Sequence, residues 1–233
     1  MMRLKVYADR MSQPSRAVLI FCKVNGIAFE EIKVDISKRQ QLSPEYAEIN
    51  PMQKVPSIVD GRFKLFERFP TDLSRRAKIN SVLDWHHSNL RHGAVTFVVN
   101  TVLAPGVGLP LNSQLATEGE KLLSSSLSKL ENFWLKGDGQ FLLGGFKPSI
   151  ADLSLVCEIM QLEVLDEKDR ERILVPYKKV LQWIEDTRYA TRPHFDEVHN
   201  ILYKAKRKFQ EKRSKQTNNE TGPTDKITLP SKI

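Results

Sequence analysis

Cysteine is scarce in this sequence: Cys22 and Cys157 are the only two among 233 residues. Two thiols exclude a disulfide framework and a four-cysteine zinc site. The sequence also lacks an apolar run near the ~18 residues that a membrane-spanning helix needs. Its first residues, Met1 to Lys5, alternate like a strand and do not form the apolar segment of a signal peptide. We therefore expect an intracellular, soluble protein with no membrane partner.

The excess positive charge is concentrated near the end of the chain. Residues 204–233 hold nine Lys/Arg and three Asp/Glu, and so contribute +6 of the net charge of +8. The basic run from Lys204 to Lys215 contains one aromatic residue, Phe209. A nucleic-acid-binding face normally concentrates such charge on a folded surface. We interpret the run as a solvated helix end and tail, and expect no nucleic-acid partner.

Strand and helix signals alternate over the first 66 residues. Strands are predicted at 3–7, 29–34, 55–59 and 63–66, with the last two joined as a hairpin through Asp60-Gly61-Arg62. A helix over 17–24 follows Ser12 and Pro14, which suit an N-cap and a first turn, and it ends at Asn25-Gly26. This pattern indicates a small α/β unit.

From Thr71 onward, apolar residues recur with the period of a helix. Helices are predicted around residues 79–90, 122–134, 153–162, 177–189 and 194–209, with a Pro/Gly-rich break at 105–112. Ser149-Ile150-Ala151-Asp152 has the form of a capping box with Asp in place of the usual Glu or Gln. Beyond Lys215 the sequence is polar and aperiodic, which is typical of disorder. We expect an α/β domain at 1–68, an all-α domain at 71–209 and a basic flexible tail at 210–233.

Several short segments of the sequence carry a combined signal. The segments are Lys5-Val6-Tyr7, Ser12-Gln13-Pro14-Ser15-Arg16-Ala17, Arg39-Gln40-Gln41-Leu42-Ser43-Pro44-Glu45, Asn50-Pro51, Lys54-Val55-Pro56, Asp84-Trp85-His86-His87 and Pro148-Ser149-Ile150-Ala151-Asp152. Each segment is a weak signal, whereas their combination over roughly residues 2–209 is specific, and together they resemble a theta-class glutathione transferase of the plant type. The resemblance implies a thioredoxin-like domain joined to an all-α domain, in agreement with the periodicity above.

The resemblance implies a reaction in which glutathione is a substrate and no cofactor or metal takes part. Ser12 matches the family's catalytic serine, since a hydroxyl at a helix N-terminus stabilises a thiolate through a hydrogen bond and the helix dipole. A plain N-cap role for Ser12 is the alternative, and Ser15 could also cap this helix. Tyr7, at the end of the first strand, is interpreted as structural.

Further residues are expected to hold glutathione. Val55-Pro56 resembles the family's cis-proline element, which would expose the main chain of Val55 to the cysteinyl backbone of glutathione. Gln40, Gln41 and Lys54 match positions that face the glycine end of glutathione, where side-chain amides and a cation suit the carboxylate. The alternative is that these three residues are ordinary polar loop residues. The resemblance assigns Gln13, Gln40, Gln41, Lys54, Val55, Pro56 and Glu67 to glutathione binding.

The sequence departs from the family after Glu67. The family has Glu-Ser, a helix and a linker at this point, but here Arg68 follows Glu67 and the next helix begins near Leu73. The thioredoxin-like domain is therefore truncated, and the γ-glutamyl end of glutathione would lose two or three charge-assisted bonds of ~1.5–3 kcal/mol each. A shortened, exon-skipped form would explain this.

Two functions follow as hypotheses. The first is a glutathione transferase, expected as a homodimer, that acts on hydrophobic electrophiles or hydroperoxides bound by helices around Trp85 to Val99 and Val102. The alternative is a non-catalytic glutathione-transferase-like protein or partner subunit. Cys22 and Cys157 are expected to be packed core thiols, which disfavours disulfide exchange, and adjacent His86 and His87 point to different faces of a helix.

The last three residues, Ser231-Lys232-Ile233, differ in one side chain from the Ser-Lys-Leu peroxisomal signal. We expect peroxisomal import with some protein in the cytoplasm. The basic run that begins at Lys204 is the alternative signal, and it would direct the protein to the nucleus.

Overall fold

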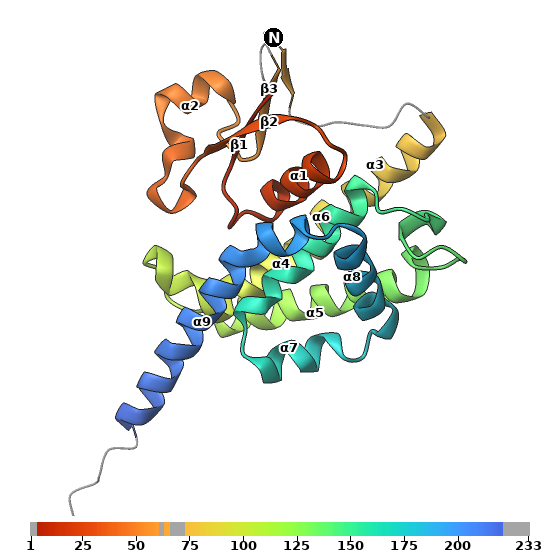
Figure 1. Cartoon of the computed structure of the whole chain (residues 1–233). Coiled ribbons are helices and arrows are strands. Elements are labelled where there is room, and N and C mark those ends of the chain that lie inside the picture. The colour runs from red at the N-terminus through yellow and green to blue at the C-terminus, as the bar shows by residue number, and fades with distance from the viewer. Residues whose placement is uncertain (1–3, 61–62, 66–72, 221–233) are drawn as a thin grey trace, which may run out of the picture.

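The computed structural model describes residues 4–60, 63–65 and 73–220, and their side chains except those of residues 63–65, 73–75, 107 and 212–220. A small sheet with its own helices lies on one side of a larger group of helices (Figure 1). The predicted thioredoxin-like α/β domain followed by an all-α domain is confirmed.

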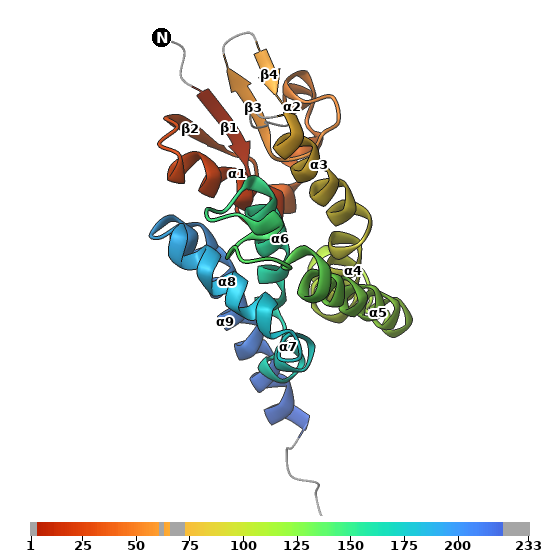
Figure 2. The same cartoon turned by 90° about the vertical axis from the view of Figure 1, so that its right-hand side faces the viewer.

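Among the described residues, four strands form the sheet, in the order β2-β1-β3-β4 (Figure 2). Strand β1 pairs in parallel with β2 and antiparallel with β3, which in turn pairs antiparallel with β4. The predicted hairpin is confirmed in its two strands, while its turn residues Gly61 and Arg62 lie outside the described residues. Tyr7 pairs with Ser57, so the end of β1 lies beside the start of β3. The strands are β1 (Leu4–Ala8), β2 (Phe29–Lys33), β3 (Ser57–Asp60) and β4 (Phe63–Leu65).

The alternating side chains of β1 pack on different helices. Val6 and Ala8 are fully buried in the core that includes Leu19 of α1 (Gln13–Val24). Tyr7, between them, contacts the ring of Tyr46 in α2 (Pro44–Ile49), with ring centroids 6.2 Å apart. This packing is consistent with a structural role for Tyr7.

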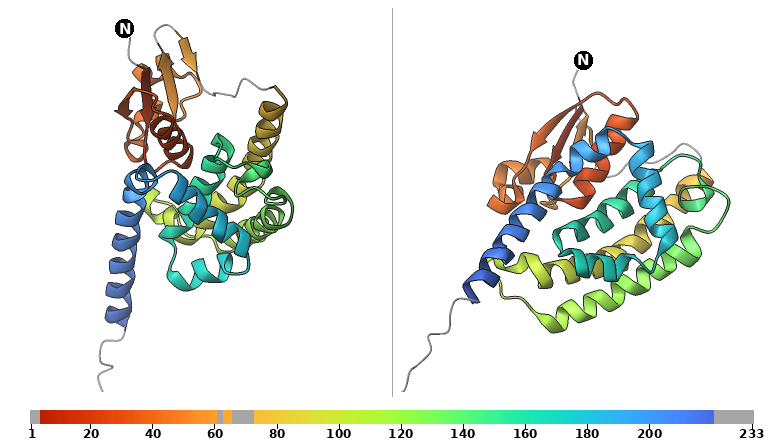
Figure 3. Two further views of the ribbon diagram at one scale, coloured as in Figure 1. Left: turned by 45° about the vertical axis from the view of Figure 1, so that its right-hand side comes forward. Right: turned by 60° about the horizontal axis from the view of Figure 1, so that its bottom comes forward.

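The all-α domain contains every helix from Leu73 onward. Helix α6 contacts α3, α4 and α8. Helix α9 projects beyond the rest of the domain (Figure 3). Its α-helices are α3 (Leu73–Ser88), α4 (Leu90–Val98), α5 (Ser113–Lys129), α6 (Ile150–Ile159), α7 (Glu167–Leu174), α8 (Lys178–Ala190) and α9 (His194–Glu220); π-helical turns lie at Val99–Leu103 and Leu130–Trp134, and 3₁₀ turns at Ala104–Val107, Leu142–Gly144 and Met160–Val164. Two further 3₁₀ turns, Ile36–Lys38 and Gln40–Leu42, lie in the α/β domain, between β2 and α2.

The predicted capping box at the start of α6 is confirmed. The Ser149 hydroxyl accepts the N–H of Ala151 at 3.2 Å, and the Asp152 carboxylate accepts the N–H of Ser149 at 2.7 Å. The same carboxylate also accepts the indole N–H of Trp183 at 2.9 Å, which ties α6 to α8. Burial raises the pKa of Asp152 against these hydrogen bonds.

Several predicted helix boundaries differ from the structure: α1 begins at Gln13 and not at residue 17, and α5 begins at Ser113 and not at residue 122. The apolar stripe from Ile79 to Leu90 predicts one continuous helix, but the chain leaves helical geometry at Asn89 (φ −119°, ψ −84°), and α3 and α4 are separate. Helix α9 continues to Glu220, well beyond Phe209. Residues 210–220, predicted as part of a flexible tail, are therefore helical.

Candidate active site

Ser12 lies where the chain turns from β1 into α1. Its backbone is extended as in an N-cap (φ −77°, ψ 126°), but its hydroxyl accepts no capping hydrogen bond. The turn is held by Asp9, whose carbonyl accepts the N–H of Ser12 at 2.9 Å and whose carboxylate accepts those of Met11 at 2.8 Å and Ile36 at 2.9 Å. The Ser12 hydroxyl therefore lies at the helix terminus without a hydrogen-bonding partner among the described residues.

The buried side chain of Arg16 holds the turn that carries Ser12 through hydrogen bonds to its main chain. It is fully buried, and its guanidinium donates to the carbonyl oxygens of Arg10 and Met11, both at 3.0 Å. It also donates to the Cys157 carbonyl at 2.9 Å and to Oε1 of Gln161 at 3.1 Å, in the all-α domain. No role for Arg16 was predicted from the sequence, although a cation within an apolar helix is a signal that could have found it.

A hydrogen-bonded cluster positions the segment that enters β3. The carbonyl of Lys54 accepts bonds from the Tyr46 hydroxyl at 2.8 Å, Nδ2 of Asn50 at 2.8 Å and the Ser57 hydroxyl at 3.2 Å. The peptide bond between Val55 and Pro56 is cis, as the resemblance implies. The sequence predicts no role for Tyr46, Asn50 or Ser57, because nothing local indicates that they share one carbonyl as a partner.

The predicted glutamine ligands lie in the 3₁₀ turn after β2. Gln40 is exposed, and its Oε1 already accepts the N–H of Asp35 at 2.7 Å, which leaves its amide N–H₂ group for a ligand. Oε1 of Gln41 is buried without a hydrogen-bonding partner in the part of the chain that the structure describes. Gln13 is half-buried in the first turn of α1, and Glu67 lies outside the described residues.

A cleft of about 480 Å³ opens between the two domains. Predicted residues Lys54, Val55 and Pro56 line it, whereas Ser12, Gln13, Gln40 and Gln41 are not among its lining residues. Pro14, on the first turn of α1, brings the helix terminus to the cleft wall. The full lining is Pro14, Val18, Lys54, Val55, Pro56, Asn80, Leu83, Asp84, His86, His87, Arg91, Ile150 and Ser154.

The expected co-substrate region, around Trp85 to Val99 and Val102, lines the cleft in part. His86, His87 and Arg91 lie within that range and line the cleft, as do Leu83 of α3 and Ile150 of α6. Trp85 does not line it; Trp85 packs on Trp134, with ring centroids 5.8 Å apart, and Phe97 and Val98 are buried in the helical core.

A buried polar cluster lies behind the cleft wall. Glu158 of α6 is 0% exposed, and its Oε2 accepts a hydrogen bond from Arg91 at 2.8 Å and lies 3.4 Å from Nε2 of His86. His86 is buried while His87 is exposed, which confirms that the adjacent histidines face different environments.

The two cysteines are buried, with 3% of Cys22 and 0% of Cys157 exposed, as predicted. Burial raises the pKa of the Cys157 thiol to about 12. No three His, Cys, Asp or Glu side chains among the described residues are grouped to hold a metal ion. Within the same residues, no helix has the length and apolar character needed to cross a lipid bilayer.

Comparison with known proteins identifies the family. The family model "Glutathione S-transferase, N-terminal domain" matches residues 2–68. The chain is 60% identical over 251 residues to glutathione S-transferase T1 of Arabidopsis thaliana, with all of both chains covered. It is 62% identical over 250 residues to glutathione S-transferase T2 of the same plant, of which the chain spans 42%. The alignment with T1 spans 18 positions more than the 233 residues of this chain.

Solved structures of glutathione transferases match this chain over most of its length. A human theta-class glutathione transferase, in complex with the glutathione conjugate of 1-menaphthyl sulfate, matches with a TM-score of 0.79 and 29% identity, covering 91% of this chain and 92% of that one. Human glutathione S-transferase T1-1 matches with a TM-score of 0.77 and 31% identity, covering 87% and 90%. Glutathione is a substrate in this family and not a cofactor. On this evidence the chain belongs to the theta class of the glutathione S-transferases.

Proposed function

We propose that this chain conjugates glutathione to electrophiles and that the Ser12 hydroxyl stabilises the attacking thiolate. The position of that hydroxyl carries the proposal: it lies at the N-terminus of α1 and caps nothing. A thiol of pKa ~8.5 is a few per cent ionised at neutral pH, and lowering its pKa by about two units raises the thiolate fraction roughly twentyfold. The hydroxyl donor and the helix terminus both favour the thiolate.

The remaining predicted residues would hold glutathione around that sulfur. The main chain of Val55 would pair with the cysteinyl backbone, while Gln13, Gln40, Gln41 and Lys54 would bind its polar ends. Lys54 supports this assignment because its side chain is exposed at the cleft while its carbonyl is fixed by three donors. Glu67 stays a prediction for the γ-glutamyl end.

The interdomain cleft would hold the second substrate. Its apolar wall, which includes Val18, Leu83 and Ile150, suits a hydrophobic electrophile. The thiolate would form a carbon–sulfur bond while the leaving group departs with the bonding electrons. With a hydroperoxide, sulfur would attack the terminal oxygen and release the alcohol, and a second glutathione would yield the disulfide and water. Such chemistry would serve detoxification.

We also propose a homodimer, an assembly general in this family. For a protein that ends at Ile233, we propose peroxisomal import through Ser231-Lys232-Ile233, with some protein in the cytoplasm. These residues lie outside the described structure. A fluorescent protein fused to the N-terminus tests the proposal, since deletion of the three residues should abolish peroxisomal import. An unchanged distribution would exclude the signal, and nuclear accumulation would favour the basic run from Lys204.

Glutathione-affinity retention together with turnover tests the enzymatic proposal. Ser12→Ala removes the thiolate's donor and should lower turnover ~10–100-fold. Ser15→Ala is the matched control: Ser15 is also on the first turn, but its hydroxyl is buried and unpartnered. It should leave turnover unchanged. A folded parent chain that neither binds glutathione nor turns over would favour the non-catalytic alternative.

A second substitution separates this chemistry from disulfide exchange. Cys22→Ser should leave turnover unchanged, because Cys22 lies in the core and not at the cleft. Loss of activity in Cys22→Ser with full activity in Ser12→Ala would assign the reaction to a cysteine and would refute the role of Ser12.

A further inference from the structure

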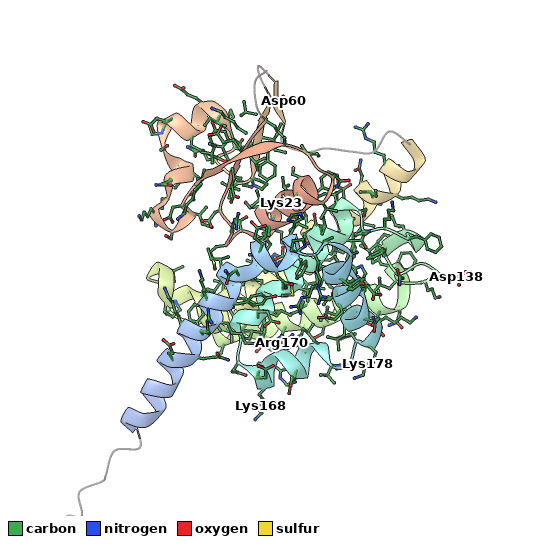
Figure 4. The ribbon with its side chains drawn as sticks, viewed as in Figure 1. Lys23, Asp60, Asp138, Lys168, Arg170 and Lys178 are labelled. Atoms are coloured by element: carbon green, nitrogen blue, oxygen red, sulfur yellow. The ribbon has the colours of Figure 1, made fainter. Side chains whose placement is uncertain are left out.

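The turn that carries Ser12 and the loop that carries the 3₁₀ turn Gln40–Leu42 leave the sheet at the same end. Strands β1 and β2 are parallel and in register, with Ala8 opposite Lys33, so both strands finish together. Figure 4 labels Asp60, which ends the antiparallel strand β3 at the opposite end of the sheet, away from the all-α domain. The turn after β1 and the loop after β2 therefore begin side by side.

The side chain of Asp9 joins this turn to this loop. Asp9 is the first residue after β1, and it is 7% exposed. One of its carboxylate oxygens accepts the N–H of Met11 at 2.8 Å, in the turn, while the other accepts the N–H of Ile36 at 2.9 Å, in the loop. An ionised carboxylate can accept both bonds because it has two acceptor oxygens and no donor. One side chain thus fixes the distance between the two segments.

Hydrogen bonds inside the loop tie its two glutamines to Ile36. Asp35, the residue before Ile36, donates its N–H to Oε1 of Gln40 at 2.7 Å, and its carbonyl accepts the N–H of Gln40 at 3.2 Å. The Asp35 carboxylate also caps the 3₁₀ turn that begins at Ile36. The position of Ile36 therefore determines the positions of Gln40 and of Gln41, which follows it directly in the chain.

The turn is tied to Asp9 in the same way. The carbonyl of Asp9 accepts the N–H of Ser12 at 2.9 Å, so the main chain of Asp9 holds the serine whose side chain is assigned to the sulfur. Buried Arg16 interacts electrostatically with Asp9 and donates to the carbonyls of the two residues between Asp9 and Ser12. A change at the Asp9 carboxylate is therefore felt in the turn and in the loop.

We propose that Asp9 is a positioning residue that couples the thiolate subsite at Ser12 to the glycine subsite at Gln40 and Gln41. The inference rests on the proposed function, in which these residues hold two parts of one glutathione molecule. The covalent structure of glutathione limits the separation of its sulfur and its glycine carboxylate. Both groups can be bound at once only where the turn and the loop keep a matching distance. Asp9 acts through these two segments and not by contact with the substrate.

γ-Glutamylcysteine, which lacks the glycine of glutathione, tests this coupling. With 4-nitrobenzyl chloride as the electrophile, kcat/KM of the parent chain should be higher for glutathione than for γ-glutamylcysteine, and their ratio measures the use of the glycine subsite. Asp9→Asn replaces one acceptor oxygen by an N–H₂ donor, so it loses one of the two main-chain bonds. We expect this variant to lower the ratio at least about threefold, mainly through kcat/KM for glutathione.

Ile36→Pro removes the other partner of the same bond. Proline lacks the N–H that Asp9 accepts, and it is tolerated at the first position of a helical turn after an extended residue such as Asp35 (ψ 102°). This variant should lower the ratio as Asp9→Asn does. Asp166→Asn is the matched control, because its carboxylate also accepts a main-chain N–H at 2.8 Å, at the start of α7, and does not line the cleft. It should leave the ratio unchanged.

The outcomes separate this coupling from the function on which it rests. A ratio that stays at the parental value in either folded variant, with equal losses for the two substrates, would overturn the coupling and leave the role of Ser12 intact. Should Asp9→Asn unfold, which urea unfolding measures, Ile36→Pro decides alone. A parent chain without turnover, or with turnover that Ser12→Ala does not lower, would refute the proposed function and the coupling together.

Discussion

The guanidinium of Arg16, in α1, donates a hydrogen bond of 2.9 Å to the main-chain carbonyl of Cys157, in α6. The same side chain donates to the carbonyls of Arg10 and Met11, in the turn that carries Ser12. One buried cation thus joins the candidate catalytic turn to the all-α domain. Burial lowers the pKa of Arg16, and Glu158 nearby opposes that effect.

Arg16→Met should therefore destabilise the protein strongly. It leaves several buried carbonyls without a donor, a loss on the order of 3–5 kcal/mol. Lys23→Met is the matched control, because Lys23 also links α1 to the all-α domain, through Glu197 at 3.0 Å, but as a partly exposed pair. That pair should contribute ~0–1 kcal/mol. Urea unfolding of both variants measures the difference, and equal losses would contradict the role of Arg16.

Tyr46→Phe should weaken glutathione binding without blocking the chemistry. It removes one of three donors to the Lys54 carbonyl, and so loosens the segment that presents Val55. We expect KM for glutathione to rise about 3–10-fold, corresponding to the ~1 kcal/mol of one hydrogen bond, with kcat nearly unchanged. Tyr177→Phe, which loses a hydroxyl bond to Ser124 in the all-α domain, should change neither constant. A fall in kcat alone for Tyr46→Phe would argue against this positioning role.

Gly93→Ala should disrupt the packing of α4 on α5. A Cβ at Gly93 would lie 2.5 Å from the main-chain nitrogen of Leu123, and one at Gly119 would lie 2.5 Å from that of Phe97. Helix backbones cannot yield locally, so we expect a loss of ~1–3 kcal/mol or more. Gly106→Ala, where no atom lies within 4 Å, should change stability by less than about 0.5 kcal/mol. Thermal and urea unfolding compare the two, and a tolerated Gly93→Ala would refute the close approach.

His199 should make stability depend on pH. It is buried, and burial together with the charges of Arg16 and Arg188 lowers its pKa to about 3. The unfolded chain binds a proton there with a pKa of ~6.5. The folded state is therefore fully favoured above about pH 6.5 and loses stability as pH falls toward 3.

The test compares the free energy of unfolding at pH 7 and pH 4.5. The parent should lose about 2–3 kcal/mol more than His199→Gln over this range. His92→Gln, at an exposed position, should keep the parental dependence. A His199→Gln variant with the parental pH dependence would show that other groups cause the loss.

Sequence alone determined the features that neighbouring residues encode. The capping box of Ser149 and Asp152 closes within one helical turn, and the alternation of Val6, Tyr7 and Ala8 separates the two faces of β1. Ser12 also followed from its place before a helix, since a strand–helix junction is local. The break at Asn89 and the helical continuation to Glu220 were missed, because apolar period and composition describe averages over several turns.

Tertiary structure decided which distant groups meet. Arg16 and Cys157, which share a hydrogen bond, are separated by 141 positions in the chain. Neither local sequence indicates the other as its partner. The interdomain cleft, the burial of Glu158 and a cavity between α7, α8 and α9 likewise arise only when helices pack. The physical reason is that caps and strand faces depend on bonds a few residues long. A site depends instead on packing that brings remote side chains within hydrogen-bond distance and removes water from between them.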